Sequence, residues 1–134
     1  MTILLDTHAL LWWQAGGERL SAVADQAIRA ADRVLVSPLS CWEAITLHRQ
    51  GRIALDRDPR VWVKALFRVP RVELATLGPE AAAFAGTLDL DRFPGDPIDW
   101  MLYATALDLR VPLVTKDERL TEYARATGDV DVIW

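Results

Sequence analysis

Four acidic residues that lie far apart in the chain fall at the ends of apolar runs or near the starts of helix-like segments: Asp6, Glu43, Asp99 and Asp117. Carboxylates are normally spread over a protein surface, because crowding raises their pKa values and costs folding free energy. Mg²⁺ and Mn²⁺ prefer oxygen ligands of this kind. If the fold gathers these acids, the sequence predicts a divalent metal site and, from it, cleavage of phosphodiesters.

Short apolar runs that alternate with helix-like segments must position these acids. Strands are expected at residues 3–5, 34–36, 72–74, 111–115 and 130–133, and helices at 9–13, 21–31, 37–50, from 58, 79–90, 96–109 and from 117, with a loop at 92–95. This alternation predicts one α/β domain over residues 1–134, with a central parallel sheet of four to five strands flanked by helices. Functional groups of such sheets collect beyond the carboxyl ends of the strands, so the acids can converge there.

Apolar spacing also predicts which helix faces are buried. The helix at 21–31 is expected to turn Val23, Ala27 and Ala30 inward. The helix at 37–50 is expected to bury Leu39, Trp42, Ile45 and Leu47. Trp12 and Trp13 are neighbours on one helix and cannot share a direction, so one of them is a candidate for an interface.

Each acid also has a structural alternative. Asp96 precedes Pro97 and is a good helix N-cap, one turn from Asp99 on the same face. Asp99 would be stabilised by the helix dipole, and Asp117 could cap the next helix. Asp6 and Glu43 are harder to explain in this way, because apolar residues flank them. A coincidence at all of these positions is a poor explanation, which favours the metal site.

Charge is distributed unevenly along the chain, whose formal net charge is −4. Residues 49–71 hold seven basic residues against two acidic ones, and a strip of this kind could bind a polyanion through residues such as Arg49, Arg52 and Arg57. After the resemblance described below, these three are the candidates for steering the substrate. The alternative for this basic strip is a solvated helix face. The single Cys41 allows no internal disulfide, and neither a signal peptide nor an apolar run of membrane-spanning length is evident, so a cytoplasmic protein is expected.

Four motifs carry a family resemblance that extends over essentially the whole chain. They are LLDTHALLW at 4–12, SPLSCWEA at 37–44, DPID at 96–99 followed by ATAL at 104–107, and LVTKD at 113–117. In this order they resemble the motifs of PIN-domain ribonucleases, and more narrowly the VapC-type toxins of type II toxin–antitoxin pairs. One position departs from the pattern, because Trp100 stands where relatives often carry Arg.

The resemblance implies an Mg²⁺- or Mn²⁺-dependent endoribonuclease. By position, Asp6, Glu43 and Asp99 would be the core metal-binding acids, Asp117 a fourth that acts through water or on a second ion, and Asp96 an accompanying acid. The resemblance also implies a homodimer and a small antitoxin protein that blocks the acidic pocket. The antitoxin would carry the DNA-binding part, so this chain would meet operator DNA only through the complex.

Polar residues beside the acids have supporting roles in this hypothesis. Thr7, Ser37 and Thr115 are candidates to orient carboxylates or waters, and His8 and Lys116 to contact substrate. Their alternatives are ordinary strand-end, helix-start and solvent-facing positions. Two rival functions also stay open: a phosphatase or phosphotransferase with Asp6 as nucleophile, and a catalytically silent PIN-fold binding module.

Overall fold

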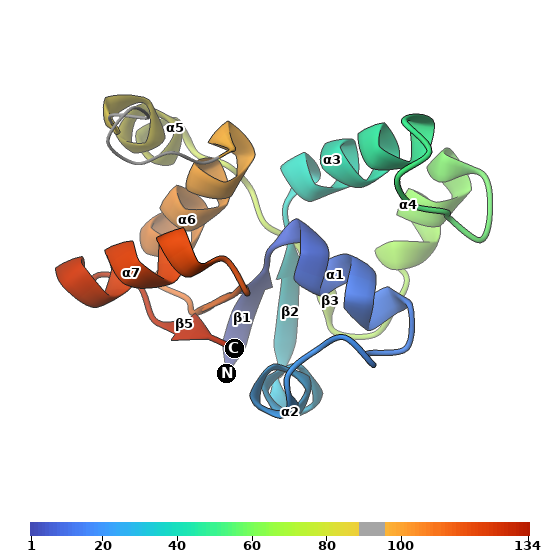
Figure 1. Cartoon of the computed structure of the whole chain (residues 1–134), viewed down its shortest axis with the longest axis horizontal. Coiled ribbons are helices and arrows are strands. Elements are labelled where there is room, and N and C mark those ends of the chain that lie inside the picture. The colour runs from blue at the N-terminus through green and yellow to red at the C-terminus, as the bar shows by residue number, and fades with distance from the viewer. Residues whose placement is uncertain (89–95) are drawn as a thin grey trace.

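The computed structural model describes residues 1–88 and 96–134 (Figure 1). The strands are β1 Thr2–Leu5, β2 Arg33–Val36, β3 Val72–Leu74, β4 Leu113–Val114 and β5 Val132–Ile133. The helices are α1 Thr7–Gln14, α2 Ala22–Ala30, α3 Pro38–Arg49, α4 Pro59–Leu66, α5 Pro79–Thr87, α6 Pro97–Leu109 and α7 Glu118–Thr127. No helix within the described ranges is long and apolar enough to cross a bilayer.

The strands form one parallel sheet in the order β3-β2-β1-β4-β5. The chain runs from β1 outward through β2 to β3, and it then returns to the other side of β1 for β4 and β5. The strand order therefore reverses between β1 and β4, where open α/β sheets usually bind their ligands. The predicted parallel sheet flanked by helices is confirmed, with β3 at one edge and β1 at the centre.

Alternate residues of each strand enter two different cores, as the twofold period of a strand requires. Ile3 and Leu5 pack with residues of α1, α2, α3 and α4 on one face of the sheet. Leu4 packs on the other face with residues of α6 and α7, and α5 contributes the partly buried Phe84. Figure 1 shows the same division, with α5, α6 and α7 on one side of the sheet and α1 to α4 on the other. Both faces are covered, which explains why the strands are apolar runs.

The predicted buried face of α2 is wrong, and that of α3 is correct for Leu47 but wrong for Trp42. In α2, Ala24 and Ile28 are buried, whereas Val23 is 59% exposed. In α3 the buried stripe is Ser40, Ala44 and Leu47, and Trp42 is 61% exposed.

The ends of some elements also differ from prediction. Helix α5 ends at Thr87, short of the predicted Leu90, which lies outside the described residues together with the predicted loop at 92–95. Strand β4 covers only Leu113–Val114 of the predicted 111–115.

Candidate functional site

Asp6 lies at the carboxyl end of the central strand and starts the next helix. Its backbone N–H donates to the Val114 carbonyl at 3.0 Å, and its Oδ1 accepts the Ala9 N–H at 2.7 Å as the N-cap of α1. The Thr115 hydroxyl donates to its Oδ2. Burial raises the pKa of Asp6, the hydrogen bonds from Thr115 and Ala9 oppose this rise, as does His8, and Glu43 adds to it. The carboxyl is thus held in place while it stays close to a second acid.

Thr115 connects Asp6 to Asp117. Its side chain is fully buried, and the Oγ1 that donates to Asp6 also accepts the Asp117 N–H at 3.1 Å. Asp117 in turn caps α7, because its Oδ1 accepts the N–H groups of Arg119 at 2.8 Å and Leu120 at 3.1 Å. The first and fourth motifs therefore meet across the β1–β4 pair.

Asp99 is the acid on which the others act most strongly. It lies in the first turn of α6, and the pKa of Asp99 is raised to about 7, first by burial and then by the carboxylates of Glu43, Asp117, Asp6 and Asp96, in that order. Carboxylates alter one another's pKa in this way only when they are near each other. The other four predicted acids therefore lie close enough to Asp99 for their charges to act on it.

Glu43 has a carboxylate oxygen that lacks a hydrogen-bond partner among the described residues. This oxygen, Oε1, is buried. A buried carboxylate oxygen without a donor is costly, and a bound cation is one way to satisfy it. A hard divalent ion fits this site, because such an ion prefers carboxylate oxygens as ligands. The Glu43 Oε1 without a hydrogen bond and the raised pKa of Asp99 both indicate negative charge that a cation would stabilise.

The acids do not yet form a closed ligand shell. In residues 1–88 and 96–134, no group of three or more His, Cys, Asp or Glu side chains is placed to hold a metal ion as it stands. Asp96 is exposed and caps α6, with its Oδ1 accepting the Ile98 N–H at 2.9 Å. Repulsion among like charges favours such an open arrangement of the carboxylates.

Comparison with known proteins decides the family. The PIN domain model matches residues 3–126 of the chain. The chain belongs to the PIN domain family. A relative, Ribonuclease VapC22 from Mycobacterium tuberculosis, is 41% identical over 122 residues, which cover 91% of this chain and 92% of the relative. The resemblance to VapC-type PIN domains is therefore confirmed.

Solved structures show the same fold at much lower identity. VapBC-1 from nontypeable Haemophilus influenzae matches with a TM-score of 0.68 at 20% identity, over 98% of this chain and 96% of that one. VapBC2 from Rickettsia felis, bound to a DNA fragment from its promoter, matches with a TM-score of 0.65 at 11% identity, over 98% and 97%. At these identities the likeness establishes the fold of this PIN domain.

Two polar residues predicted to orient the acids of this PIN domain have other partners. Thr7 is buried and donates its hydroxyl to Ser40 Oγ at 3.1 Å, which joins α1 to α3. Ser37 is buried and caps α3, accepting the Leu39 N–H at 3.1 Å. Both side chains help to fix α1, which Asp6 caps, and α3, which carries Glu43. Thr115 differs from them, because its hydroxyl donates a hydrogen bond to Asp6 directly.

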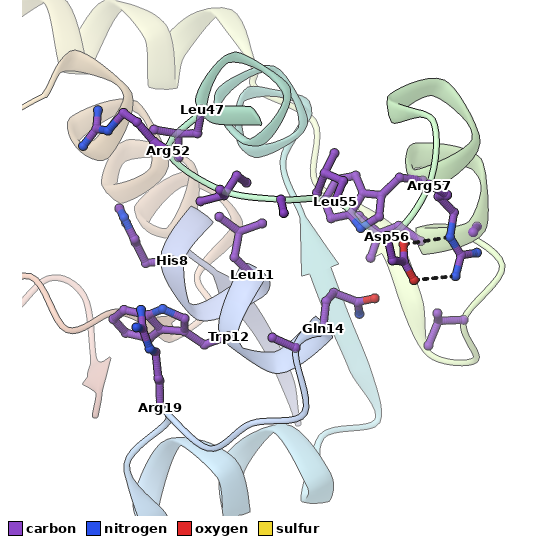
Figure 2. Close-up of a pocket in the computed structure, with 17 residues that line it drawn as sticks. His8, Leu11, Trp12, Gln14, Arg19, Leu47, Arg52, Leu55, Asp56 and Arg57 are labelled. Atoms are coloured by element: carbon purple, nitrogen blue, oxygen red, sulfur yellow. Dashed lines mark hydrogen bonds and ion pairs between the residues drawn. The ribbon is translucent and has the colours of Figure 1, made fainter. Parts of the chain in front are cut away.

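The three basic residues predicted to steer RNA differ in their surroundings. Arg49 is exposed at the end of α3. Arg52 lines a cavity of about 730 Å³ that extends between α1, α4 and residues 52–57 (Figure 2). Arg57 lines the same cavity, but its guanidinium forms two hydrogen bonds with Asp56, at 2.9 and 2.8 Å.

Other residues near the site escaped sequence reasoning. Arg19 lines the cavity, and the rings of Trp12 and Trp134 lie 5.6 Å apart between their centroids. The adjacent tryptophans in the first helix were the available signal for Trp12, and no sequence signal singled out Arg19 or Trp134. Trp100, which directly follows Asp99, is 2% exposed and packs edge-on against Tyr123, with 5.2 Å between the ring centroids.

Proposed function

We propose that this PIN domain is an Mg²⁺- or Mn²⁺-dependent endoribonuclease, the toxin component of a toxin–antitoxin pair. The observation that carries the proposal is Asp99, a half-buried carboxyl in the first turn of α6 whose pKa is raised by burial and by the charges of Glu43, Asp117, Asp6 and Asp96. The relative with 41% identity is named as a ribonuclease, which supports the same activity here.

We assign the metal-binding roles to Asp6, Glu43, Asp99 and Asp117, with Asp96 as the accompanying acid at the rim. Asp6 would be the most firmly held ligand, because the Ala9 N–H and the Thr115 hydroxyl fix both of its oxygens in position. Glu43 brings the unsatisfied Oε1, and Asp99 must release its proton before it can bind a cation. Thr115 positions Asp6 and Asp117 together.

A bound divalent ion would lower the pKa of a water molecule and stabilise the negative charge that develops on the phosphate. The residues of the chain have the task of holding the acids aligned, and the Ala9 N–H and the Thr115 hydroxyl also favour the charged form of Asp6. His8 and Lys116 are both exposed. His8 follows Asp6 by two residues and Lys116 directly follows Thr115, so a phosphate bound at Asp6 could meet them. The substrate is an RNA backbone, whose phosphates the exposed Arg49 and the cavity-lining Arg52 would attract.

Asp6→Asn tests the activity. Asparagine also serves as an N-cap, so far-UV circular dichroism should be unchanged. Loss of a residue that only supports a metal ligand costs about 10–100-fold in activity. Loss of Asp6, a proposed ligand, should lower the rate of RNA cleavage in Mg²⁺ by more than this. Asp58→Asn is the matched control, because Asp58 caps α4 through the Arg60 and Val61 N–H groups and is not among the acids that act on Asp99. Full cleavage by the Asp6 variant would refute the assignment.

We also propose that the chain forms a homodimer in the cytoplasm and binds a small antitoxin that covers the acidic site. Solved structures with this fold are VapBC assemblies, one of them bound to promoter DNA, which supports contact with operator DNA through the antitoxin. Light scattering of the chain alone, and after co-expression with the neighbouring open reading frame, tests this. A fully active monomer that no co-expressed partner inhibits contradicts it.

A further inference from the structure

A cluster of aromatic and basic side chains lies next to the acidic site, and the proposed cleavage chemistry does not account for it. Its centre is Trp12 on α1. The ring centroid of Trp12 lies 5.7 Å from that of His8 and 5.6 Å from that of Trp134, and Lys116 Nζ lies 5.8 Å from it. These four residues, His8, Trp12, Lys116 and Trp134, are called the Trp12 cluster below.

The Trp12 cluster is joined to the acids through very short stretches of chain. His8 follows Asp6 by two residues and acts on its charge. Lys116 directly follows Thr115, whose hydroxyl donates to Asp6. A polymer whose reacting phosphate lay at Asp6 would therefore have its adjoining units beside Trp12.

Trp12 also borders open space. It lines the cavity of about 730 Å³, a volume within the range of about 300–1,000 Å³ that is usual for sites of small organic groups. Apolar side chains line part of this cavity, among them Leu11, Leu47 and Leu66. Its walls can thus accept a flat, weakly polar group such as a nucleobase.

The charges around the cavity suit a polyanion. His8, Arg19 and Arg52 line it, and Figure 2 shows them with Trp12 on the same side of the space. Asp56 is the only acid among the described lining residues, and its carboxylate is engaged by Arg57 on the opposite side (Figure 2). A positive wall next to an aromatic ring is the combination with which proteins bind single-stranded nucleic acids.

We infer that Trp12 is a stacking platform for a nucleobase of single-stranded RNA next to the cleaved phosphodiester, and that Arg19, Arg52 and Lys116 bind its phosphates. The inference deepens the proposed ribonuclease function and rests on it. Every base has a π-face, so a stacking site of this kind selects unpaired RNA with little preference for sequence. In duplex RNA the base faces are stacked on one another and are not available to Trp12.

Trp12→Leu and Trp12→Phe test the platform, because leucine keeps an apolar side chain and phenylalanine keeps a smaller ring. Binding of a labelled single-stranded RNA is measured by fluorescence anisotropy in EDTA, so that no cleavage occurs. The Kd should rise about tenfold for the leucine variant, within the range that loss of one stacked base produces, and less for the phenylalanine variant. In cleavage assays the rise in KM should exceed any fall in kcat.

Two controls separate stacking from charge and from folding. Trp13→Leu changes the next residue of the same helix, which packs against the core and does not line the cavity, so RNA affinity should be unchanged. Inorganic polyphosphate carries negative charge as RNA does but has no bases, so Trp12→Leu should leave the affinity for polyphosphate unchanged. Lys116→Ala should weaken the binding of both RNA and polyphosphate.

Three outcomes overturn the inference. The first is an RNA affinity that is unchanged in Trp12→Leu. The second is a loss of affinity in Trp12→Leu that is equal for RNA and polyphosphate. The third is a loss of RNA affinity in Trp13→Leu as large as that in Trp12→Leu. If Trp12→Leu weakens binding of a partner protein but not of RNA, the cavity is a protein-docking site. The proposed function fails separately, when wild-type protein binds RNA in EDTA yet does not cleave it in Mg²⁺ or Mn²⁺.

Discussion

Burial raises the pKa of both Asp6 and Asp99, but the surroundings of the two acids differ. Asp6 accepts hydrogen bonds from Ala9 and Thr115, which favour its charged form against burial. Asp99 is partly buried among like charges, and its pKa is raised to about 7. The residue types and their motifs were readable from the sequence, but this contrast depends on packing and could not be predicted from it.

The pH dependence of stability should report the proton on Asp99. In the absence of metal, the folded state binds this proton more tightly than the unfolded chain, whose pKa is near 3.8. The free energy of unfolding therefore decreases as pH rises from about 4 to about 7, and this contribution levels off above that range. Urea titrations in EDTA across this window should show the decrease in wild type and a smaller one in Asp99→Asn.

Asp32→Asn provides the control of opposite sign. The pKa of Asp32 is lowered by the N-terminal ammonium, so its contribution is lost only as the solution becomes more acidic than the ordinary range of an aspartate. This variant should keep the wild-type decrease between pH 4 and 7. A wild-type stability that rises across this window would contradict the raised pKa of Asp99.

At the level of elements, the site is assembled from helix starts. Asp6, Ser37, Asp96 and Asp117 each cap a helix that follows the sheet or faces it. The positive ends of these helix dipoles partly offset the repulsion among the acids. Serine, aspartate and proline made the helix starts at Ser37, Asp96 and Asp117 predictable, whereas the first helix was predicted from residue 9 and begins at Thr7 with Asp6 as its cap.

The buried faces of two helices were not predictable by the same means. In α3, the buried stripe begins with Ser40, a polar residue whose place in the core is explained by its hydrogen bond from Thr7. In α2, alanines occupy both of the possible stripes, so the apolar spacing does not choose between them. Only the position of the sheet decides that Ile28 is buried and Val23 is not.

Arg71 shows that part of the basic strip is structural. Its Nη1 donates to the carbonyls of Ile28 at 3.0 Å and Ala31 at 2.5 Å at the end of α2, and its backbone has a positive φ of 72°. Arg71→Ala should lower the free energy of unfolding by about 1–3 kcal/mol, because hydrogen bonds from a charged donor are lost. Arg71→Gly should be less destabilising, since glycine adopts this φ without strain.

Arg49→Ala is the matched control for Arg71, because Arg49 is exposed. Its effect on stability should stay within about 0.5 kcal/mol. Urea denaturation measures all three variants. Equal stability of the alanine and glycine variants would contradict the strain at this φ, and a loss in Arg49→Ala as large as in Arg71→Ala would show that the contacts of Arg71 with α2 do not matter.

For the whole molecule, the acids connect the two cores of the sheet. Glu43 precedes Ala44, which belongs to the core with α1, α2 and α4. Asp99 precedes Trp100, and Asp117 caps the helix of Leu120, both in the core on the other face. A cation bound between these acids would hold both layers together. Its binding free energy should therefore appear in global unfolding and not only in local order.

Thermal melting at pH 8, where Asp99 is mostly deprotonated, should detect this linkage. At a Mn²⁺ concentration about 100-fold above Kd, the gain is about 2.7 kcal/mol, which corresponds to a rise in Tm of roughly 10 °C for a domain of this size. Glu43→Gln should abolish the rise, because it removes one negative charge from the site. Glu118→Gln, at an exposed acid in the first turn of α7, should keep it. A wild-type melting curve that does not respond to millimolar Mn²⁺ or Mg²⁺ would mean that the acids gather for some purpose other than metal binding.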